Sequence, residues 1–358
     1  MGGGLMQLVA YGAQDVYLTG NPQITFFKVV YRRHTNFACE AIEQTFNGTP
    51  SLGGKATVPI TRNGDLVTKM WLHTTATATG AVVTDLGYNM IKSIELQIGG
   101  TKIDKHYGKW MYVWHKLTST AEKTTAHDIM TQQTAMANND TSELFVPLQF
   151  FCCRNDGLAL PLIALQYHDV RLEFEFNTVT NCSISNTTLL VNYIYLDSEE
   201  RKRFAQASHE YLIEQLQFTG VESVTANASN KVRLNFNHPV KELIWVNGDA
   251  AVADDDAVTS ALLQLNGHDR FSQQNGRFFD SVQPHTHHTN SRAGVNVYSF
   301  ALNPEEHQPS GTCNFSRIDN ATLTVQIANG ASTSLYVYGV NYNVLRIMSG
   351  MGGVAYSN

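Results

Sequence analysis

The stretch VRLEFEF at Val170–Phe176 places an apolar side chain at every second position and a charged one between them. Because successive side chains of a β-strand point to opposite faces, such a strand buries one face in a core and turns the other outward. The same alternation returns at three more places, which are Ile94–Ile98, Val232–Phe236 and Leu323–Ile327. The sequence therefore predicts a protein built mainly of half-buried strands.

Helical patterns are few. Lys109–Leu117 gathers its large apolar residues on one helical face, and Glu199–Ala207 follows Asp197, which we expect to cap the helix N-terminus. The stretch Thr118–Ser142 between these two helices is polar and rich in Thr, Asn and Gln. We expect it to form a long surface loop with at most a helical turn.

Three segments of the first half recur in the second half, in the same order and at an offset of about 170 residues. The pairs are Ile42–Gly48 with Ile213–Gly220, Leu96–Gly100 with Leu263–Gly267, and Gly108–Met111 with Gly276–Phe279. Both halves also close on a tyrosine-rich strand pattern, at Leu189–Leu196 and Leu335–Leu345. The shared order and the near-constant offset indicate two copies of one domain.

Each half carries about eight strand patterns with long connections and no alternation of strand and helix. This arrangement predicts an all-β double jelly roll: two tandem eight-stranded antiparallel domains with a few short helices. We expect an N-terminal arm at residues 1–25, a first domain at 26–197, a helical connector at 198–209 and a second domain at 210–358.

Composition narrows the class of function. The chain has 358 residues, of which 43% are hydrophobic and only 16% charged, and its net charge is −6. The apolar content suffices for two cores, and the low charged fraction indicates that much surface is buried against neighbouring molecules. A negative chain with no basic stripe is unlike a nucleic-acid-binding protein, so we expect no direct nucleic-acid partner.

The five cysteines are odd in number and form no CxxC pair; they are Cys39, Cys152, Cys153, Cys182 and Cys313. We expect free thiols and assembly in a reducing compartment. The first basic residue is Lys28, so the N-terminus does not read as a secretory signal, and Met6 breaks the myristoylation pattern. No apolar run approaches the 18 or so residues of a membrane span.

Seven Asn-x-Ser/Thr sequons occur, at Asn47, Asn139, Asn181, Asn186, Asn227, Asn314 and Asn320. A chain this rich in Asn and Thr contains several by chance. Without a secretory signal we do not expect host N-glycosylation, although the sequence leaves glycosylation of any one sequon open.

The run HTHH at His285–His288 is the most suggestive metal-binding pattern. Cupin-type enzymes follow a His-x-His pair with a Glu a few residues later, whereas the next Glu here is Glu305. A third ligand would have to come from Asp280, His268 or His238. We interpret the run as part of a polar surface loop.

Two other patterns have residue types found in nucleotide-binding or catalytic sites. The sequence GGKA at Gly53–Ala56 lacks the Ser or Thr that follows the lysine of a phosphate-binding loop, so we expect a hairpin turn. His168, Asp169 and Asp156 could serve as acid–base groups, but their places at a strand start and in a turn favour structural roles. We therefore predict no catalytic, cofactor-binding or metal-binding residues and no enzymatic activity.

Four blocks of the chain carry a more specific signal: GAQDVYLTGNPQITFF at Gly12–Phe27, YRRHTNF at Tyr31–Phe37, LALPLIALQYH at Leu158–His168 and QPSGTCNFSR at Gln308–Arg317. Together these blocks resemble the major capsid protein of nucleocytoplasmic large DNA viruses. The resemblance implies a double jelly roll that forms homotrimeric, pseudo-hexagonal capsomers, and an icosahedral shell around an internal membrane. It implies neighbouring capsomers, minor capsid proteins and a penton protein as partners, a place in the virion, and assembly in the host cytoplasm.

Three segments have expected positions in such a shell. Residues 2–20 are apolar with a single charge, Asp15, and we expect them to form an arm along the inner surface. Thr118–Ser142, and Ser281–Val295 at the equivalent place in the second half, are expected to face outward or to pack over the three-fold axis. Both are candidates for contacting host surfaces or decoration proteins. Two functions of other classes stay open from the sequence: a carbohydrate-binding jelly-roll protein and a cupin-like metalloenzyme.

Overall fold

The structure, a computed structural model, describes residues 3–24, 26, 32–82, 84–248, 257–328, 330–331 and 333–356. These fall into two units, residues 1–36 and 37–358. The first unit contains two short helices, α1 (Gly3–Val9) and α2 (Asp15–Thr19). The predicted arm and the first resembling blocks include Gly2, Thr25 and residues 27–31, which lie outside the described residues.

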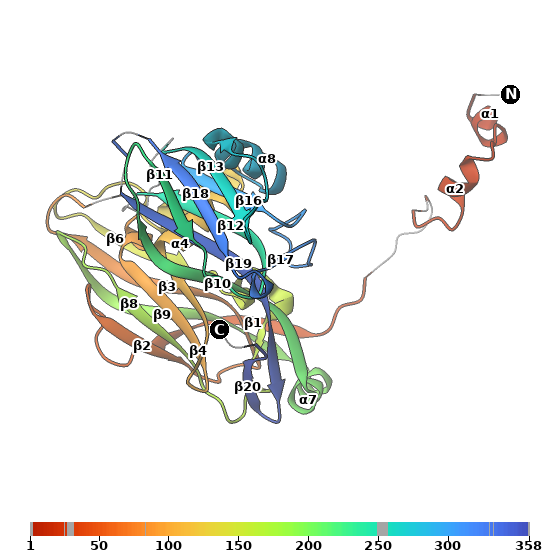
Figure 1. Ribbon diagram of the computed structural model, residues 1–358. Coiled ribbons are helices and arrows are strands. Elements are labelled where there is room, and N and C mark those ends of the chain that lie inside the picture. The colour runs from red at the N-terminus through yellow and green to blue at the C-terminus, as the bar shows by residue number, and fades with distance from the viewer. Residues whose placement is uncertain are drawn as a thin grey trace. The chain divides into compact units, whose positions relative to one another are not determined.

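The second unit begins with two facing antiparallel sheets (Figure 1). One has the order β1 (Phe37–Thr45), β9 (Cys182–Leu196), β3 (Leu66–Ala78), β6 (Thr141–Pro147), with β7 (Leu160–Pro161) beside β3. The other has the order β2 (Lys55–Ile60), β8 (Val170–Phe176), β4 (Ile91–Ile98), β5 (Thr101–Tyr107). Strand β8 is the alternating stretch VRLEFEF, and its apolar residues are buried as predicted.

Two further antiparallel sheets follow with the same order. One runs β10 (His209–Ser223), β19 (Ser334–Met348), β12 (Pro239–Asn247), β16 (Val295–Ser299), with β17 (Cys313–Asn314) beside β12 and β20 (Met351–Val354) beside β19. The other runs β11 (Ser229–Arg233), β18 (Ala321–Ile327), β13 (Val258–Leu265), β14 (His268–Asp269), with β15 (Gln274–Asn275) beside β13. Strand by strand, the second pair of sheets repeats the first, so the predicted double jelly roll is confirmed.

The helices are short and lie between strands. They are α3 (Leu86–Asn89), α4 (Gly108–Thr118), α5 (Ala121–Met130), α6 (Phe151–Arg154), α7 (Ser198–Gln206) and α8 (Gln283–His287), with single turns η1 (Asp156–Leu158), η2 (Phe278–Val282) and η3 (Phe315–Arg317). Over the described residues, none of the helices has both the length and the apolar character needed to span a bilayer.

Both predicted helices are confirmed. Helix α4 covers Lys109–Leu117, and α7 begins after Asp197, whose side chain accepts a hydrogen bond from the Ser198 amide at 2.8 Å. The predicted surface loop Thr118–Ser142 is wrong in part, because it contains the ten-residue helix α5 and the start of β6. Because helix α5 has no fully buried residue, its sequence lacks the apolar repeat of 3–4 residues that would have predicted a helix.

The repeated motifs occupy equivalent turns. Gly99 and Gly100 join β4 to β5 with φ values of 57° and 80°, and Asn266 and Gly267 join β13 to β14 with 51° and 81°. Positive φ at both central residues is the signature of a type I′ hairpin turn, which favours Gly and Asn because it is strained for other residues. This conformation explains why LQIGG and LQLNG recur.

Asparagine also serves this conformation at several of the sequons. Positive φ occurs at Asn139, Asn181, Asn186 and Asn227. Asparagine tolerates the left-handed region because its short side chain can hydrogen-bond locally. Four of the seven sequons thus contain an asparagine that the backbone conformation favours.

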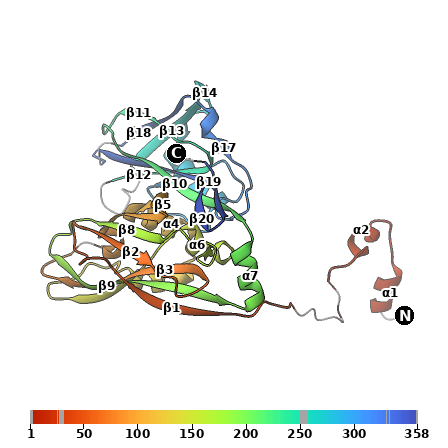
Figure 2. The same cartoon turned by 90° about the horizontal axis from the view of Figure 1, so that it is seen from below.

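The two jelly rolls lie side by side and share one apolar contact zone. Figure 2 shows α4, β5 and α6 between the two halves. One core cluster fills the first jelly roll and continues into the outer face of the sheet β10-β19-β12-β16, whereas a second cluster lies inside the second jelly roll. Across the zone, the ring centres of Trp110 and Tyr338 are 5.2 Å apart, and those of Tyr107 and Phe218 4.8 Å.

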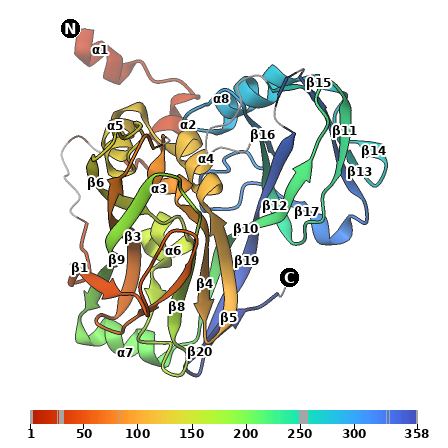
Figure 3. The same ribbon diagram turned by 90° about the vertical axis from the view of Figure 1, so that its left-hand side faces the viewer.

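Helix α7 is the connection between the halves. Strand β9 ends at Leu196 and β10 begins at His209, with α7 between them. Figure 3 shows α7 at the lower end of β9. A second connection returns from the C-terminus, where the Tyr167 amide donates to the carbonyl of Gly350 at 3.0 Å. The predicted domain limits at residues 25, 197 and 209 stay a prediction.

The repeated glycines before α4 and η2 make a close backbone contact. A Cβ at Gly108 would overlap the carbonyl oxygens of Tyr88 and Ile91, and a Cβ at Gly276 would overlap that of Val258. In each jelly roll, the chain can therefore turn from strand into helix at this place only with glycine.

We expect Gly108→Ala and Gly276→Ala each to lower the free energy of unfolding by about 1–3 kcal/mol, because a backbone oxygen cannot move aside as a flexible side chain can. Urea unfolding followed by tryptophan fluorescence measures this. Gly353→Ala is the matched control, since a Cβ there meets no atom within 4 Å. Equal stability of all three variants would contradict the assignment.

Candidate functional site at the junction of the jelly rolls

The GGKA motif forms a turn, but the predicted hairpin is wrong. The Gly54 amide donates to Ser51 at 3.0 Å, and β2 begins at Lys55. The strands on either side, β1 and β2, belong to different sheets, and β2 pairs with β8 instead. The turn therefore carries the chain from one sheet to the other, and no helix follows it to hold a phosphate.

The three acid–base candidates have structural contacts or positions. His168 Nδ1 lies 3.0 Å from the Gly352 carbonyl oxygen of β20, which ties the C-terminal strand to the first jelly roll. Asp169 pairs with Arg62 at 3.6 Å and its side chain is 97% exposed. Asp156 begins the turn η1. That none of them is catalytic stays a prediction.

The interpretation of His285–His288 as a polar surface loop is wrong for its last residue. His285 is exposed on α8, but the His288 side chain is fully buried. Its Nε2 lies 3.0 Å from Glu242 Oε2, and its Nδ1 lies 3.0 Å from Glu305 Oε1. The chain after β16 folds back and brings Glu305 to the imidazole. The sequence did not predict this contact because Glu305 lies far from His288 along the chain.

None of the other suggested ligands joins His288. The Asp280 carboxylate accepts a hydrogen bond from Ser281 Oγ at 2.6 Å. His268 is exposed on β14, and His238 lies in the chain before β12. With both ring nitrogens bonded to carboxylates, His288 has no lone pair to offer a metal ion.

The charge of His288 follows from its partners. Burial by itself lowers the pKa of His288, but the neighbouring Glu242 and Glu305 outweigh burial and raise the pKa to about 9. The same contact, together with Thr289, holds the pKa of Glu305 below its usual value against the opposing effect of burial. At neutral pH the three side chains therefore form a buried carboxylate–imidazolium–carboxylate group.

A second buried ion group adjoins the first. Glu214 Oε2 accepts from Arg154 Nη1 at 3.0 Å, and Glu214 Oε1 lies 2.7 Å from Nζ of the fully buried Lys241. The Arg154 guanidinium also lies 4.2 Å from the ring centre of Trp114. We call these six residues the junction cluster: Arg154, Glu214, Lys241, Glu242, His288 and Glu305.

The junction cluster connects elements of both jelly rolls. Arg154 comes from α6 in the first, whereas Glu214, Lys241 and Glu242 come from β10 and β12 in the second. A cavity of 360 Å³ opens beside Arg154, Glu214 and Glu305. Buried ions contribute little net stability, but losing one partner leaves an unpaired charge, so the cluster favours one fixed placement of the two domains.

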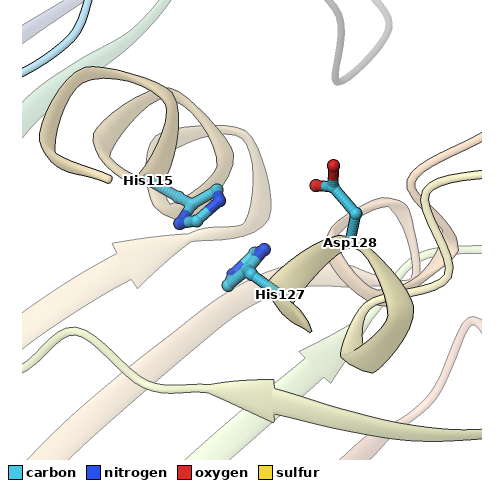
Figure 4. Close-up of side chains that lie close together, drawn as sticks. All are labelled: His115, His127 and Asp128. Atoms are coloured by element: carbon cyan, nitrogen blue, oxygen red, sulfur yellow. The ribbon is translucent and has the colours of Figure 1, made fainter. Parts of the chain in front are cut away.

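A different cluster has the composition of a metal site. His115 of α4 and the neighbours His127 and Asp128 of α5 offer ligand atoms that all lie within 4.8 Å of one another. Figure 4 shows the two imidazole rings face to face with the Asp128 carboxylate beside them. Sequence reasoning missed this group because α5 was expected to be a loop, so nothing placed residue 127 against residue 115.

Comparisons with known proteins agree with the fold. Residues 25–205 match the family described as "Major capsid protein N-terminus", and residues 200–353 match "Large eukaryotic DNA virus major capsid protein". Two major capsid proteins align over the full length of both chains: that of Pyramimonas orientalis virus is 54% identical and that of Paramecium bursaria Chlorella virus 1 is 43% identical.

Solved structures give the same result. A chain in the quasi-atomic model of the PBCV-1 virus capsid superimposes with a TM-score of 0.85 at 38% identity, covering 93% of this chain and all of that one. The Faustovirus major capsid protein has a TM-score of 0.78 at 13% identity over 94% of both chains, which is a likeness of fold alone.

We expect His288→Gln to destabilise the protein by about 3 kcal/mol near pH 6, because it removes the cation between two buried carboxylates. The folded pKa of about 9 lies above the unfolded value of 6.5, so this stabilisation is complete below pH 6.5 and is lost as the pH rises through 9. Urea unfolding at pH 6, 8 and 10 should show the gap between wild type and variant closing.

His285→Gln, at an exposed position on α8 three residues before His288, is the control and should match wild type throughout. If wild type and His288→Gln differ by the same amount at all three pH values, His288 is not charged in the folded protein.

Proposed function

We propose that this chain, which belongs to the large eukaryotic DNA virus major capsid protein family, builds the icosahedral shell as homotrimers of pseudo-hexagonal outline. The family is structural and non-enzymatic, and the protein is a component of the virion capsid. The trimer is our inference. The observation that carries it is one sheet face that is covered in the second jelly roll and partly exposed in the first.

In the second jelly roll, the outer face of the sheet β10-β19-β12-β16 packs on the first jelly roll. Ile244 of β12 pairs with Val297 of β16 on one side and Tyr338 of β19 on the other. All three side chains are fully buried and belong to the core cluster that fills the first jelly roll.

In the first jelly roll, the equivalent face is only partly covered. His73 of β3 pairs with Phe145 of β6 and Thr188 of β9, which repeats the arrangement around Ile244. All three residues, with Trp71 and Leu190 beside them, are partly exposed. The His73 and Phe145 rings stack with centres 4.4 Å apart, and the exposed carboxylate of Glu143 lies 4.0 Å from His73 Nε2 at the edge of this aromatic patch.

The edge strands show the same contrast. Strand β10 is buried where it meets β5: the Leu216 amide donates to Asp104 at 3.1 Å, and Glu214 bonds to Arg154. Strand β1 carries the same Glu-Gln motif, yet most of its residues, Glu43 among them, are exposed. A long exposed edge strand is a liability that proteins usually cover.

A repeated contact resolves both contrasts. Within one chain, the second jelly roll packs its outer sheet face on the first jelly roll. If the first jelly roll packs its equivalent face on the second jelly roll of a neighbouring chain, the contact between chains is head-to-tail. Six similar domains then close a ring, which takes three chains. One gene product can thereby form a nearly six-fold tile for a flat facet.

We expect Phe145→Lys and Thr75→Arg to convert trimers of roughly 120 kDa into monomers of 39.7 kDa, because each buries a charge in the proposed contact. Thr75 lies on the same outward face and tests the contact without removing a large side chain. Size-exclusion chromatography with light scattering measures the mass.

Lys231→Glu changes an exposed charge on β11 and should leave the trimer intact. A wild-type protein that is monomeric under all assembly conditions would refute the proposal, and glycan binding by that monomer would favour a carbohydrate-binding protein instead.

The N-terminal unit is proposed to be an arm on the inner surface of the shell. Its helix α1 and the residues around α2 expose large apolar side chains, including Leu8, Tyr17 and Leu18. Deleting residues 2–20 should leave trimers intact but impair their assembly into shells, as seen by electron microscopy. Normal shells from the deleted protein would exclude the arm from assembly.

The remaining partners are proposals of the same kind. We propose contacts with neighbouring capsomers, minor capsid proteins and a penton protein, an internal membrane nearby, and host contacts through the regions 118–142 and 281–295. Assembly in the host cytoplasm is supported by the five cysteines, all of which are free thiols. The division at residues 26–197 and 210–358 is supported by the two family matches.

A further inference from the structure

Helices α4 and α5 meet at a pair of histidines, of which His115 is buried and His127 is partly buried. His115 lies in the last turn of α4 and is 7% exposed, and His127 lies in the last turn of α5. Their rings stack with centres 3.2 Å apart and planes 12° apart. Neither residue was singled out by the sequence, and the capsid function does not use them.

Two nitrogens of this pair are buried without a hydrogen-bond partner. They are His115 Nε2 and His127 Nδ1. A buried polar atom that lacks a partner costs about 1–3 kcal/mol, and such atoms are few in folded proteins. Other buried side-chain atoms of the described residues also have no partner, but these two lie on adjacent imidazole rings with a carboxylate beside them, so one ion could satisfy both.

We infer that His115, His127 and Asp128 bind a divalent transition metal ion of the zinc type. Two imidazoles and a carboxylate are ligands that Zn²⁺, Co²⁺ and Ni²⁺ accept, whereas Mg²⁺ and Ca²⁺ prefer oxygen ligands alone. Three protein ligands leave a fourth position for water.

The hydrogen bonding of His127 suits metal binding. His127 Nε2 lies 2.6 Å from the Tyr88 hydroxyl, which leaves Nδ1 as the ring nitrogen that can bind an ion.

Two movements complete the site. Imidazole lone pairs lie in the ring plane, so stacked rings must turn apart to direct them at one ion. Ligand atoms of a tetrahedral zinc site are roughly 3.3 Å apart, which follows from bonds of about 2 Å, and the present spread is up to 4.8 Å. Lys116, whose Nζ lies 3.3 Å from Asp128 Oδ1, must also yield this carboxylate or share it.

The position gives the ion a structural role. Helix α4 presents Trp110 to Tyr338 of the second jelly roll, and Trp114 lies edge-on to His288 of the junction cluster. An ion held by α4 and α5 would fasten the surface helix α5 to the helix on which the two jelly rolls meet. The site thus stiffens the junction and is independent of trimer formation.

The test uses the full-length, untagged protein, stripped with a chelator and passed through gel filtration after addition of ZnCl2. Mass spectrometry of the metal should find one zinc per chain in wild type. His127→Ala and Asp128→Asn should each weaken zinc binding at least tenfold. Co²⁺ should give the visible absorption of a tetrahedral site, and Mg²⁺ should not compete.

His285→Ala, which removes an exposed histidine elsewhere, is the control and should retain zinc as wild type does. Asp128 is partly exposed, so Asp128→Asn tests the site even if a histidine variant fails to fold. Two results would overturn the inference and leave the histidines as a packing pair. One is that wild type binds no zinc, and the other is that both single variants, Asp128→Asn and His127→Ala, bind as much zinc as wild type.

Discussion

The burial of one sheet face against the neighbouring domain is the contact on which the rest of this structure depends. The outer face of β10-β19-β12-β16 carries apolar residues where a solvated sheet would carry polar ones. Both faces of this sheet are therefore apolar, but the core of the second jelly roll covers only the inner face. A sheet with both faces apolar must be covered on both. The first jelly roll supplies that cover through α4, β5 and α6.

Apolar contact alone would allow the two domains to slide, and the junction cluster restricts this. Lys241 and His288 are fully buried cations, and each has a carboxylate within 3.0 Å. Any shift of one domain would separate a buried charge from its partner, which costs far more than the pair contributes. Apolar burial therefore supplies affinity between the domains, and the ions define their placement.

Duplication without identity is what makes such a chain useful for a shell. The two jelly rolls share strand order, type I′ turns and the glycines before α4 and η2. They differ on the equivalent sheet faces, where Ile244 is buried and His73 partly exposed. The same surface is thus used within the chain in one copy and remains available for a neighbouring chain in the other.

The sequence by itself determined the class of fold, the duplication, the helices α4 and α7, and the family, because each depends on patterns a few residues long or on repeated motifs. Alternation in Val170–Phe176 identifies a strand wherever it packs. Only the tertiary structure decided that His288 is a buried cation beside Glu305, that His115 meets His127, and that β10 is covered while β1 is exposed. The histidine contacts join segments far apart in the chain, and β1 and β10 carry the same motif in different surroundings. Local sequence patterns carry no information about which surfaces meet in the folded protein.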